Sequence, residues 1–425
     1  MGDRLVIKGG NRIEGKLEVS GAKNACLPLM AASILSQDPV ELDRVPDISD
    51  VRIMIKILEE MGVIVDYDHK GHMYLDARNL STTRAPEEYV VRMNASFDVM
   101  GPLLSRHGHG EVSLPGGCKL GPRPVDMHID AFKAMGAEVV KEGGFVKAKC
   151  PRLKGCRILF PKVSVGATKN SMMAATLAEG VTTLENCARE PEITDLAQFL
   201  VSMGAKIEGI GTQTLHIEGV SSLHGTKYSV ISDRIEAGTF MLAGAITEGD
   251  VFIDNISIEM LENFVMEMRK AGQEVIEENG GLRVKGHRPI NPLDITTAPY
   301  PGFPTDLHPP MAALLALGNG TSIMNETIFN GRYMYVMELG RLGADILVNN
   351  QTARIIGVKG FVGAPVDAPD IRAGGALLLA GLAAEGETTI RGVRYIDRGY
   401  QHIEERLRSL GADIVRVKEP LTPLP

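Results

Sequence analysis

The most regular feature of the chain is a pattern of apolar and polar positions that occurs six times. In each copy, a segment with helical spacing ends in an apolar residue, a glycine follows, and a run with β-branched residues begins, as in "LEEMGVIV", "KAMGAEVV" and "GRLGADIL". Glycine after a helix is typical of a left-handed C′ residue, so each copy predicts a helix, a turn and a strand. The glycines are spaced 68 to 74 residues apart, at Gly62, Gly136, Gly204, Gly272, Gly343 and Gly411.

A second, more apolar helix is expected in every copy. Segments such as "GAKNACLPLMAASIL", "GATKNSMMAATLAEG" and "IRAGGALLLAGLAAEG" are rich in Ala, Leu, Met and Gly. They are apolar on most faces, which is typical of a buried helix. Most of them continue through a glycine into a short strand, such as "VTTLEN" or "DVFIDN". Common dipeptides such as Met-Gly could produce single matches by chance, but six evenly spaced copies favour six α/β units, three in each of two domains, with sheets outside and helices inside.

Composition narrows the class of protein. The chain has 425 residues, too many for one hydrophobic core, and 44% of them are hydrophobic. A net charge of −8 argues against a general nucleic-acid binder. No apolar run approaches the roughly 18 residues of a membrane span, and the start resembles no signal peptide. Five scattered cysteines indicate no disulfide framework, so a soluble cytoplasmic protein is expected.

Polar side chains gather where the buried helices are expected to start. Helix N-termini offer unbonded N–H groups and a positive dipole end, which suit anions. If the units pack with pseudo-symmetry, several of these ends would meet in a cleft between the domains and bind a phosphorylated or carboxylated substrate. The residues concerned are Lys23, Asn24, Asn94, Ser96, Ser164, Asp233, Arg234, Asp306 and Arg372.

The segment "LPGGCKLGPRP" places Cys118 on a glycine- and proline-rich loop. Neither a helix nor a central strand suits this composition, so a mobile loop is predicted. The cations Lys119 and Arg123 on either side favour the thiolate form of the cysteine. An exposed cysteine without a role is the alternative, but a reactive thiol that closes over a bound substrate explains the setting better.

Five segments together resemble the UDP-N-acetylglucosamine 1-carboxyvinyltransferase family of enolpyruvyl transferases. They are "SGAKNACLP", "LPGGCKLGPRPVDMHI", "KVSVGAT", "PYPGFPTDLHPP" and "IDRGYQHIEERL", and the resemblance runs from about Leu5 to Val417. It implies an α/β fold, a two-domain inside-out α/β barrel, here built from six repeated βαβαββ-type units. Residues 22–230 are expected to form the domain with the cysteine loop, residues 1–21 and 231–425 the other domain, with the active site in the cleft between them.

The resemblance also implies site residues. Lys23 and Asn24 resemble contacts to phosphoenolpyruvate, and Cys118 resembles a loop cysteine that donates a proton and can form an adduct with that substrate. Asp306 resembles the carboxylate at the reacting hydroxyl of the sugar, and Arg398, like Lys23, a catalytic cation. Further residues on the phosphate and carboxylate side are Arg123, Arg332, Arg372 and Arg398. Those that resemble contacts to the nucleotide sugar are Asn94, Arg123, Pro124, Val125, Asp126, Met127, Lys162, Val163, Ser164, Gly166, Asp306 and Ile328.

The sequence departs from the family pattern at one of these positions. Many members have an arginine that touches the nucleotide sugar where this chain has Asn94, in "RMNASF". Arg92 lies two residues away and could replace it only in part. Read without the resemblance, several of the residues have ordinary alternatives: Asp306 as a helix N-cap, Lys23 as a solvated lysine, and a lone arginine as half of a surface salt bridge.

The implied reaction joins the enolpyruvyl group of phosphoenolpyruvate to the 3′-hydroxyl of UDP-N-acetylglucosamine and releases phosphate, the first committed step of peptidoglycan synthesis. Neither a metal nor a cofactor is expected, nor a nucleic-acid or membrane partner, and a monomer or weak oligomer is expected. Three rivals stay open: a shikimate-type enolpyruvyl transferase, which lacks the cysteine loop; a catalytically silent paralogue that binds the nucleotide sugar; and an RNA-end processing enzyme with a similarly repeated fold.

Overall fold

Two compact units make up the computed structural model, which describes residues 2–90, 92–114 and 125–418. Of these residues, those up to Ser20 and from Ser232 onward form the first unit, and those from Gly21 to Ile231 form the second. The chain therefore begins in the first unit, runs through the whole of the second and returns to the first. Each unit contains three of the six sheets formed by the described residues.

The repeated element is seen without interruption in the last third of the second unit. Its six elements follow one another as β9 (Arg157–Leu159), α6 (Val165–Ala175), β10 (Val181–Glu185), α7 (Pro191–Ser202), β11 (Lys206–Glu208) and β12 (Thr214–Glu218). The sheet order is β11-β12-β10-β9, in which β9 runs parallel to β10 and the other pairs are antiparallel. This is the predicted βαβαββ unit, with the first helix making the crossover between the parallel strands.

The same element occurs in the first unit as β17 (Asp294–Thr296), α10 (His308–Leu315), β18 (Thr321–Asn325), α11 (Tyr335–Arg341), β19 (Asp345–Asn349) and β20 (Thr352–Ile356). Its sheet order, β17-β18-β20-β19, and its one parallel pair match those of the previous copy. Three short 3₁₀ helices of this unit are η3 (Ile258–Leu261), η4 (Thr305–Leu307), which leads directly into α10, and η5 (Arg332–Met334), which leads into α11.

The two other sheets of the second unit are variations of this element. One contains β3 (Val40–Asp43), β4 (Ile64–Tyr67) and β5 (Met73–Asp76) and takes its parallel edge strand, β13 (Lys227–Ser229), from the far end of the unit. The other contains three strands, β6 (His109–Ser113), β7 (Glu138–Glu142) and β8 (Phe145–Lys149), with a single parallel bridge from Arg84 to Glu111 in place of a fourth. The helices are α1 (Lys23–Ala32), η1 (Ser33–Leu35), α2 (Ser49–Glu60), α3 (Glu87–Val90), η2 (Asn94–Val99), α4 (Met100–His107) and α5 (Asp126–Ala134).

In the first unit, the N-terminal strands complete two sheets that are otherwise formed by distant residues. Strand β2 (Glu14–Glu18) runs parallel to β14 (Asp250–Asp254), and β1 (Arg4–Lys8) lies between β22 (Glu387–Arg391) and β23 (Asp413–Val417), antiparallel to both. The remaining elements are α8 (Arg234–Ile246), α9 (Glu262–Lys270), β15 (Glu274–Glu278), β16 (Gly281–Lys285), β21 (Pro365–Asp367), α12 (Ile371–Ala383), α13 (Val393–Ile396) and α14 (Ile403–Ser409). Sheet hydrogen bonds thus join the N-terminal strands to the later part of the first unit.

The six repeat glycines have the predicted conformation. They follow helices α2, α5, α7, α9, α11 and α14, and their φ angles lie between +91° and +101°. Residues with a β-carbon rarely adopt this left-handed region, which turns the chain sharply from helix into strand. The repeat read from the sequence is therefore a repeat of backbone geometry, and the prediction is confirmed.

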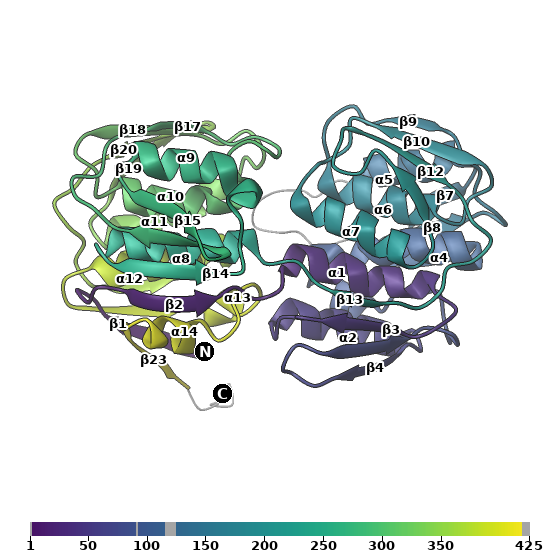
Figure 1. The fold of residues 1–425 in the computed structure, drawn as a ribbon, viewed down its shortest axis with the longest axis horizontal. Helices are drawn as coiled ribbons and strands as arrows, with labels where there is room; N and C mark the ends of the chain where they lie inside the picture. The colour runs from purple at the N-terminus through teal and green to yellow at the C-terminus, as the bar shows by residue number, and fades with distance from the viewer. Residues whose placement is uncertain (1, 91, 115–124, 419–425) are drawn as a thin grey trace. The chain divides into compact units, whose positions relative to one another are not determined.

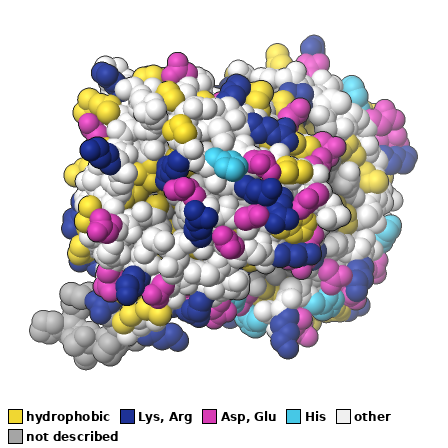
Figure 2. All heavy atoms as spheres, turned by 60° about the vertical axis from the view of Figure 1, so that its left-hand side comes forward, with side chains coloured by type: hydrophobic (Ala, Val, Ile, Leu, Met, Phe, Trp, Pro, Cys, Tyr) yellow, Lys and Arg dark blue, Asp and Glu magenta, His cyan; other side chains and the backbone are white. Residues whose placement is uncertain are grey.

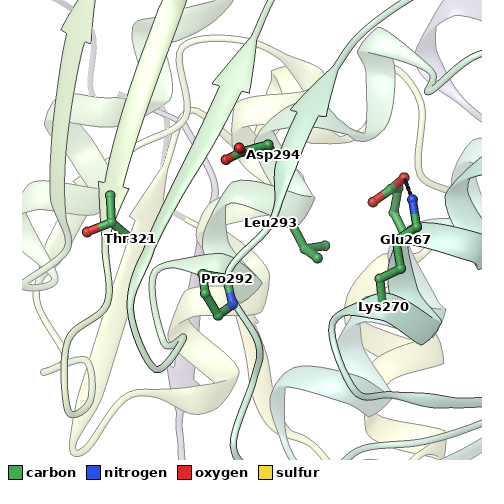
Figure 3. Close-up of a pocket in the computed structure, with 6 residues that line it drawn as sticks. All are labelled: Glu267, Lys270, Pro292, Leu293, Asp294 and Thr321. Atoms are coloured by element: carbon green, nitrogen blue, oxygen red, sulfur yellow. Dashed lines mark hydrogen bonds and ion pairs between the residues drawn. The ribbon is translucent and has the colours of Figure 1, made fainter.

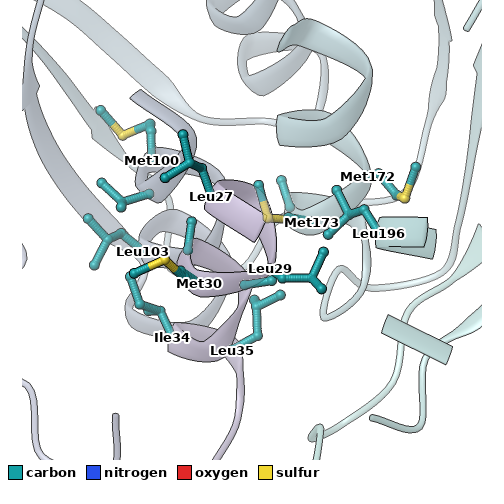
Figure 4. Packing of buried hydrophobic residues seen from close by; sticks show 14 of the residues in the cluster. Leu27, Leu29, Met30, Ile34, Leu35, Met100, Leu103, Met172, Met173 and Leu196 are labelled. Carbon is teal, nitrogen blue, oxygen red and sulfur yellow. The ribbon is translucent and has the colours of Figure 1, made fainter. Parts of the chain in front are cut away.

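Apolar helices form the core of each unit. All thirteen residues of α8 are buried, and α8, α10 and α12 contact one another within the first unit, where strands surround them in Figure 1. Figure 4 shows the equivalent packing in the second unit, where Met30 of α1, Leu103 of α4 and Met173 of α6 belong to one buried cluster. A helix that is apolar all round must be covered on every side, which accounts for helices inside and sheets outside. The predicted inside-out α/β arrangement is confirmed.

The surface and the helix lengths limit what the molecule can contact. Figure 2 shows Lys and Arg side chains interspersed with Asp and Glu on the face in view. Among the described residues, no helix is both long enough and apolar enough to cross a lipid bilayer.

Candidate active site

Asp306 lies between two buried arginines of the first unit. One carboxylate oxygen, Oδ1, accepts a hydrogen bond of 2.8 Å from Nη2 of Arg332, and the other, Oδ2, accepts one of 3.0 Å from Nη2 of Arg372. The arginine side chains are 2% and 5% exposed, while that of Asp306 is 25% exposed. Charge-assisted bonds to both oxygens fix the plane of the carboxylate and leave one side of it accessible.

Two of the ordinary alternatives for these residues are wrong. The N-cap positions of η4 and α10 are Pro304 and Leu307, so Asp306 is not an N-cap, although it supplies an acidic charge in the first turn of η4. Arg332 and Arg372 are buried rather than part of surface salt bridges. The contact between these three side chains depends on three segments that the fold brings together.

Arg372 is held at the start of α12 by its neighbours. The side chain of Asp370 caps the helix by accepting hydrogen bonds from the backbone N–H groups of Arg372 and Ala373, at 2.8 and 3.0 Å. The guanidinium carbon lies 5.7 Å from the ring centroid of Tyr400, whose hydroxyl lies 3.0 Å from Thr239 Oγ1. Burial opposes the charge, but Asp306, Tyr400 and Asp233 outweigh it and raise the pKa of Arg372 above its usual range. The guanidinium is therefore a permanent cation.

Arg398 lies in the turn between α13 and Tyr400, and its side chain is half-buried. The preceding residue, Asp397, accepts bonds of 2.9 and 2.7 Å from Arg416 of β23, which also pairs with Glu404. The hydrogen bonds that Arg416 donates to the carboxylates of Asp397 and Glu404 raise its pKa above the usual range. This cluster fixes the backbone of the turn that carries Arg398.

Lys23 is the first residue of α1 in the second unit, and it is not a solvated lysine. Its Nζ lies 2.8 Å from Oδ2 of Asp50, at the start of α2, and the two side chains are 12% and 1% exposed. Asn24, the next residue, is exposed at the same helix start. The ion pair fixes the ammonium group of the residue that begins α1, and the free N–H groups at this helix end favour an anion.

Two segments predicted to contact the nucleotide sugar meet at His128. Val125 precedes α5, which contains Asp126 and Met127, and Ser164 caps α6 by accepting a bond from the N–H of Ala167 at 3.3 Å. A β-carbon added to Gly166 would lie 3.1 Å from Nε2 of His128, so the imidazole lies directly against the first turn of α6. Lys162, which is exposed, and Val163, which is half-buried, precede this turn in the sequence.

His128 is a neutral imidazole with an assigned partner. Its Nδ1 lies 3.1 Å from the Nδ2 of Asn170, whose amide also donates to the carbonyl of Phe97 at 2.9 Å. Because the amide nitrogen donates, Nδ1 accepts and the proton is on Nε2, toward Gly166. Burial lowers the pKa of His128 to about 3. Sequence reasoning missed this residue, although it lies inside the quoted segment "RPVDMHI". The carboxylate of Asp126, which was predicted to contact the nucleotide sugar, lies 2.6 Å from Nζ of Lys141.

The expected helix start at Asn94 is wrong by about two turns. Residues 94–99 form the 3₁₀ helix η2, and α4 begins only at Met100. Ser96 is buried and donates its hydroxyl to the carbonyls of Val90 and Met93, so it stabilises this turn rather than facing a ligand. Side-chain bonds of this kind compete with regular helix and explain the late start.

Some predicted site residues lie outside the described part of the chain. These are Cys118, Arg123 and Pro124, and the side chain of Asn94 is not described either. Ile328 is described, and its backbone N–H donates to Oε1 of Glu326 at 2.8 Å. The backbone group that Ile328 can offer to a ligand is therefore its carbonyl.

A surface hollow of about 410 Å³ lies elsewhere in the first unit (Figure 3). None of the predicted site residues lines it, and two of its polar side chains, Glu267 and Lys270, pair with each other at 2.8 Å. The lining residues are Glu267, Lys270, Pro292, Leu293, Asp294 and Thr321.

Comparison with known proteins shows the family of the chain. Residues 7–407 match the family model described as EPSP synthase (3-phosphoshikimate 1-carboxyvinyltransferase). The chain belongs to this family of enolpyruvyl transferases. Within it, the chain is 48% identical over 416 residues to the UDP-N-acetylglucosamine 1-carboxyvinyltransferase of Magnetococcus marinus, covering 98% of this chain and 99% of that one. The protein of the same name from Psychrobacter is 49% identical over 423 residues, covering 99% and 98%.

Solved structures extend the comparison to the fold. The enolpyruvyl transferase NikO from Streptomyces tendae superposes with a TM-score of 0.89 at 27% identity, over 99% of this chain and 100% of that one. An EPSP synthase from Acinetobacter baumannii gives a TM-score of 0.76 at 19% identity, over 98% and 100%. The second likeness concerns the fold alone. Together they agree with the six-unit α/β architecture described above.

Proposed function

We propose that this chain transfers the enolpyruvyl group of phosphoenolpyruvate to the 3′-hydroxyl of UDP-N-acetylglucosamine and releases phosphate. The curated relatives cited above carry the name of this transferase at 48 and 49% identity across nearly the whole chain. The observation that carries the proposal is the Asp306 carboxylate, ordered by two buried guanidinium groups and accessible on one side. On this proposal the enzyme acts in the cytoplasm in the first committed step of peptidoglycan synthesis.

The reaction makes three demands. Phosphoenolpyruvate becomes electrophilic at C2 when a proton reaches C3; the sugar hydroxyl then adds to C2 and loses its proton to a base. The resulting tetrahedral ketal loses a proton from C3 and expels phosphate, which restores the double bond in the enolpyruvyl ether. An acid, a base and several cations are therefore needed, but no oxidant or reductant.

Residues of both units are assigned to these roles. Cys118 is the acid that protonates C3, and Asp306 is the base at the sugar hydroxyl. Lys23 and Arg398 hold the phosphate and carboxylate of phosphoenolpyruvate, with Asn24 and Arg123 beside them. An anionic substrate competes with Asp306 for Arg332 and Arg372, and this competition increases the affinity of the carboxylate for a proton as the substrate arrives.

The uridine diphosphate part of the nucleotide sugar is assigned to the second unit. The first turns of α5 and α6 offer backbone N–H groups and a neutral His128, which suit the diphosphate. Arg123, Pro124, Val125, Asp126 and Met127 on one side, and Lys162, Val163, Ser164 and Gly166 on the other, bind its uridine diphosphate part. The carbonyl of Ile328 accepts a bond from the sugar, since its N–H is already bonded to Glu326.

The rivals are less well supported. The solved EPSP synthase shares only 19% identity, whereas the curated nucleotide-sugar transferases share 46 to 49%. A silent paralogue would not need an ordered carboxylate between two arginines, yet the chain retains it. An RNA-end processing enzyme would need a basic face, and the face in Figure 2 has mixed charge.

Phosphate release from phosphoenolpyruvate tests the proposal. The wild type is measured alone, with UDP-N-acetylglucosamine, and with shikimate 3-phosphate; release that requires the nucleotide sugar supports it. Cys118→Ala and Asp306→Asn should each lose activity by about 100-fold or more. Asp345→Asn, a change of the same kind on the exposed edge of β19, should leave activity unchanged. Release driven by shikimate 3-phosphate would favour the rival transferase, and binding of UDP-N-acetylglucosamine without release would favour the silent paralogue.

A further inference from the structure

A fully buried carboxylate, that of Glu326, bonds to residues on either side of the candidate base in the sequence. Glu326 follows β18, and its side chain is 0% exposed. Its Oε1 accepts bonds from Thr297 Oγ1 at 3.1 Å and from the backbone N–H groups of Ile328 and Phe329 at 2.8 and 3.0 Å. Its Oε2 accepts bonds from Thr305 Oγ1 at 2.9 Å and from His308 Nδ1 at 2.8 Å. The described part of the chain thus supplies donors to both oxygens from three segments.

The network continues through His308 to α11. Nε2 of His308 lies 3.0 Å from the hydroxyl of Tyr335, and both side chains are buried. Burial lowers the pKa of His308 despite the opposing effect of Glu326, so the imidazole is neutral. Since Nδ1 donates to the carboxylate, Nε2 accepts from Tyr335, whose pKa is raised by burial so that its hydroxyl keeps the proton.

Glu326 keeps its charge in this setting. Burial alone would raise its pKa, but the hydrogen bonds from His308, Phe329 and Ile328 outweigh it and hold the pKa below the usual value. A buried ionised carboxylate is costly unless its lone pairs are satisfied. A glutamine at this position has one acceptor oxygen, and its amide hydrogens would face donors, so the network requires the charged side chain.

The donors belong to the segments that carry the candidate site. Thr305 and His308 flank Asp306 on both sides, and Ile328 supplies the carbonyl assigned to the sugar. Phe329 accepts a backbone bond of 3.1 Å from Arg332, which in turn holds Asp306. One carboxylate therefore fixes the base, one of its arginines and the sugar contact relative to one another.

We propose that Glu326 is a positioning residue for the transfer reaction, acting through Thr305, His308 and the backbone of Ile328 to hold Asp306 against the sugar hydroxyl. The inference rests on the proposed function. A displacement of about 1 Å at a reacting group can cost about 100-fold in rate even when binding is retained. Loss of the network should therefore lower kcat while the KM values change little.

The test compares purified full-length variants in sugar-dependent phosphate release. Glu326→Gln should lower kcat by about 100-fold, with KM for both substrates within about 3-fold of the wild type. Thr305→Val removes one hydroxyl beside Asp306 without changing size and should lower kcat by about 10-fold. Ser322→Ala is the matched control, because the buried hydroxyl of Ser322, on the strand β18 that precedes Glu326, accepts a bond from the N–H of Leu293 at 3.0 Å rather than bonding to Glu326. It should lower the melting temperature slightly and leave kcat within about 2-fold.

The outcomes separate the two proposals. A wild type without sugar-dependent release overturns the proposed function and this inference with it. An active wild type with unchanged kcat in Glu326→Gln overturns the inference alone, as does an equal loss of kcat in Thr305→Val and Ser322→Ala. If Glu326→Gln does not fold, the comparison of Thr305→Val with Ser322→Ala decides the matter.

Discussion

The carboxylate of Asp306 and the guanidinium of Arg372 lie 3.0 Å apart although 66 residues separate them in the chain. Asp306 precedes α10 and Arg372 belongs to the first turn of α12, and these two helices pack against each other in the core of the first unit. The pair therefore depends on the packing of the buried helices: the same contacts that stabilise the core align a carboxylate with a cation.

Replacing Arg372 by lysine should expose the dependence of activity on this alignment. A lysine keeps the positive charge but lacks the planar guanidinium group, which in Arg372 bonds to Asp306 and lies near the ring of Tyr400. We expect Arg372→Lys to reduce kcat/KM by about 100-fold in phosphate release. Arg341→Lys, on a half-exposed arginine of α11, provides the control and should behave as the wild type. Full activity in Arg372→Lys would mean that charge alone suffices.

Removing Lys23 should reduce stability as well as activity. Asp50 is buried, so Lys23→Ala leaves its carboxylate without the ammonium group 2.8 Å away. Breaking a buried pair from one side costs roughly 3 kcal/mol, and a further Asp50→Asn change should restore part of the loss. Calorimetric melting of the single and double variants measures the loss of stability and its partial recovery. Restored stability without restored activity would separate the structural role of Lys23 from its proposed contact with the substrate.

The neutral state of His128 predicts a pH dependence of stability. Its pKa is about 3 in the folded chain and near the ordinary value of 6.5 in the unfolded chain. The unfolded chain binds the proton more readily between these values, so this contribution is complete above about pH 6.5 and is lost as the pH falls toward 3, at about 1.4 kcal/mol for each unit.

His128→Asn keeps an acceptor for Asn170 but cannot titrate, so the slope of stability against pH should decrease over that range. Unfolding by denaturant at several pH values measures it. His216→Asn, on an exposed position of β12, should leave the slope unchanged. Equal slopes in the wild type and His128→Asn would contradict the assignment of a neutral, buried imidazole.

Two glycines at the end of α11 should respond in opposite ways to alanine. Gly343 has a φ of +100°, whereas Gly340 lies within the helix, and a β-carbon at Gly340 meets nothing within 4 Å. Gly343→Ala should destabilise the protein by about 1 kcal/mol, because the left-handed conformation is strained with a β-carbon. Gly340→Ala should stabilise it by roughly 0.5–1 kcal/mol through helix propensity. Melting temperatures of the two variants check the sign of each change.

The repeated α/β architecture was determined by local features of the sequence. Gly62, Gly136 and their four counterparts mark the left-handed turns because residues with a β-carbon rarely adopt that conformation, and this depends on neighbouring residues only. The buried helices were equally readable, since an all-round apolar helix such as α8 must be covered. The helix start expected at Asn94 shows the limit of reading helices from local sequence. The hydroxyl of Ser96 bonds to nearby carbonyls, and the α-helix begins later than the sequence pattern predicts.

Tertiary structure decided which polar residues meet. The sequence and its family resemblance named Asp306, Arg332 and Arg372 separately, but their contact arises where η4, η5 and α12 come together. Glu326 and His308 gave no local signal, since a buried charge is tolerated only when distant donors surround it. The insertion of β1 between β22 and β23 likewise follows from strand pairing across the whole chain. Periodicity along the chain reports burial and turns, whereas the partners of a buried polar group are chosen by the packing of segments far apart in sequence.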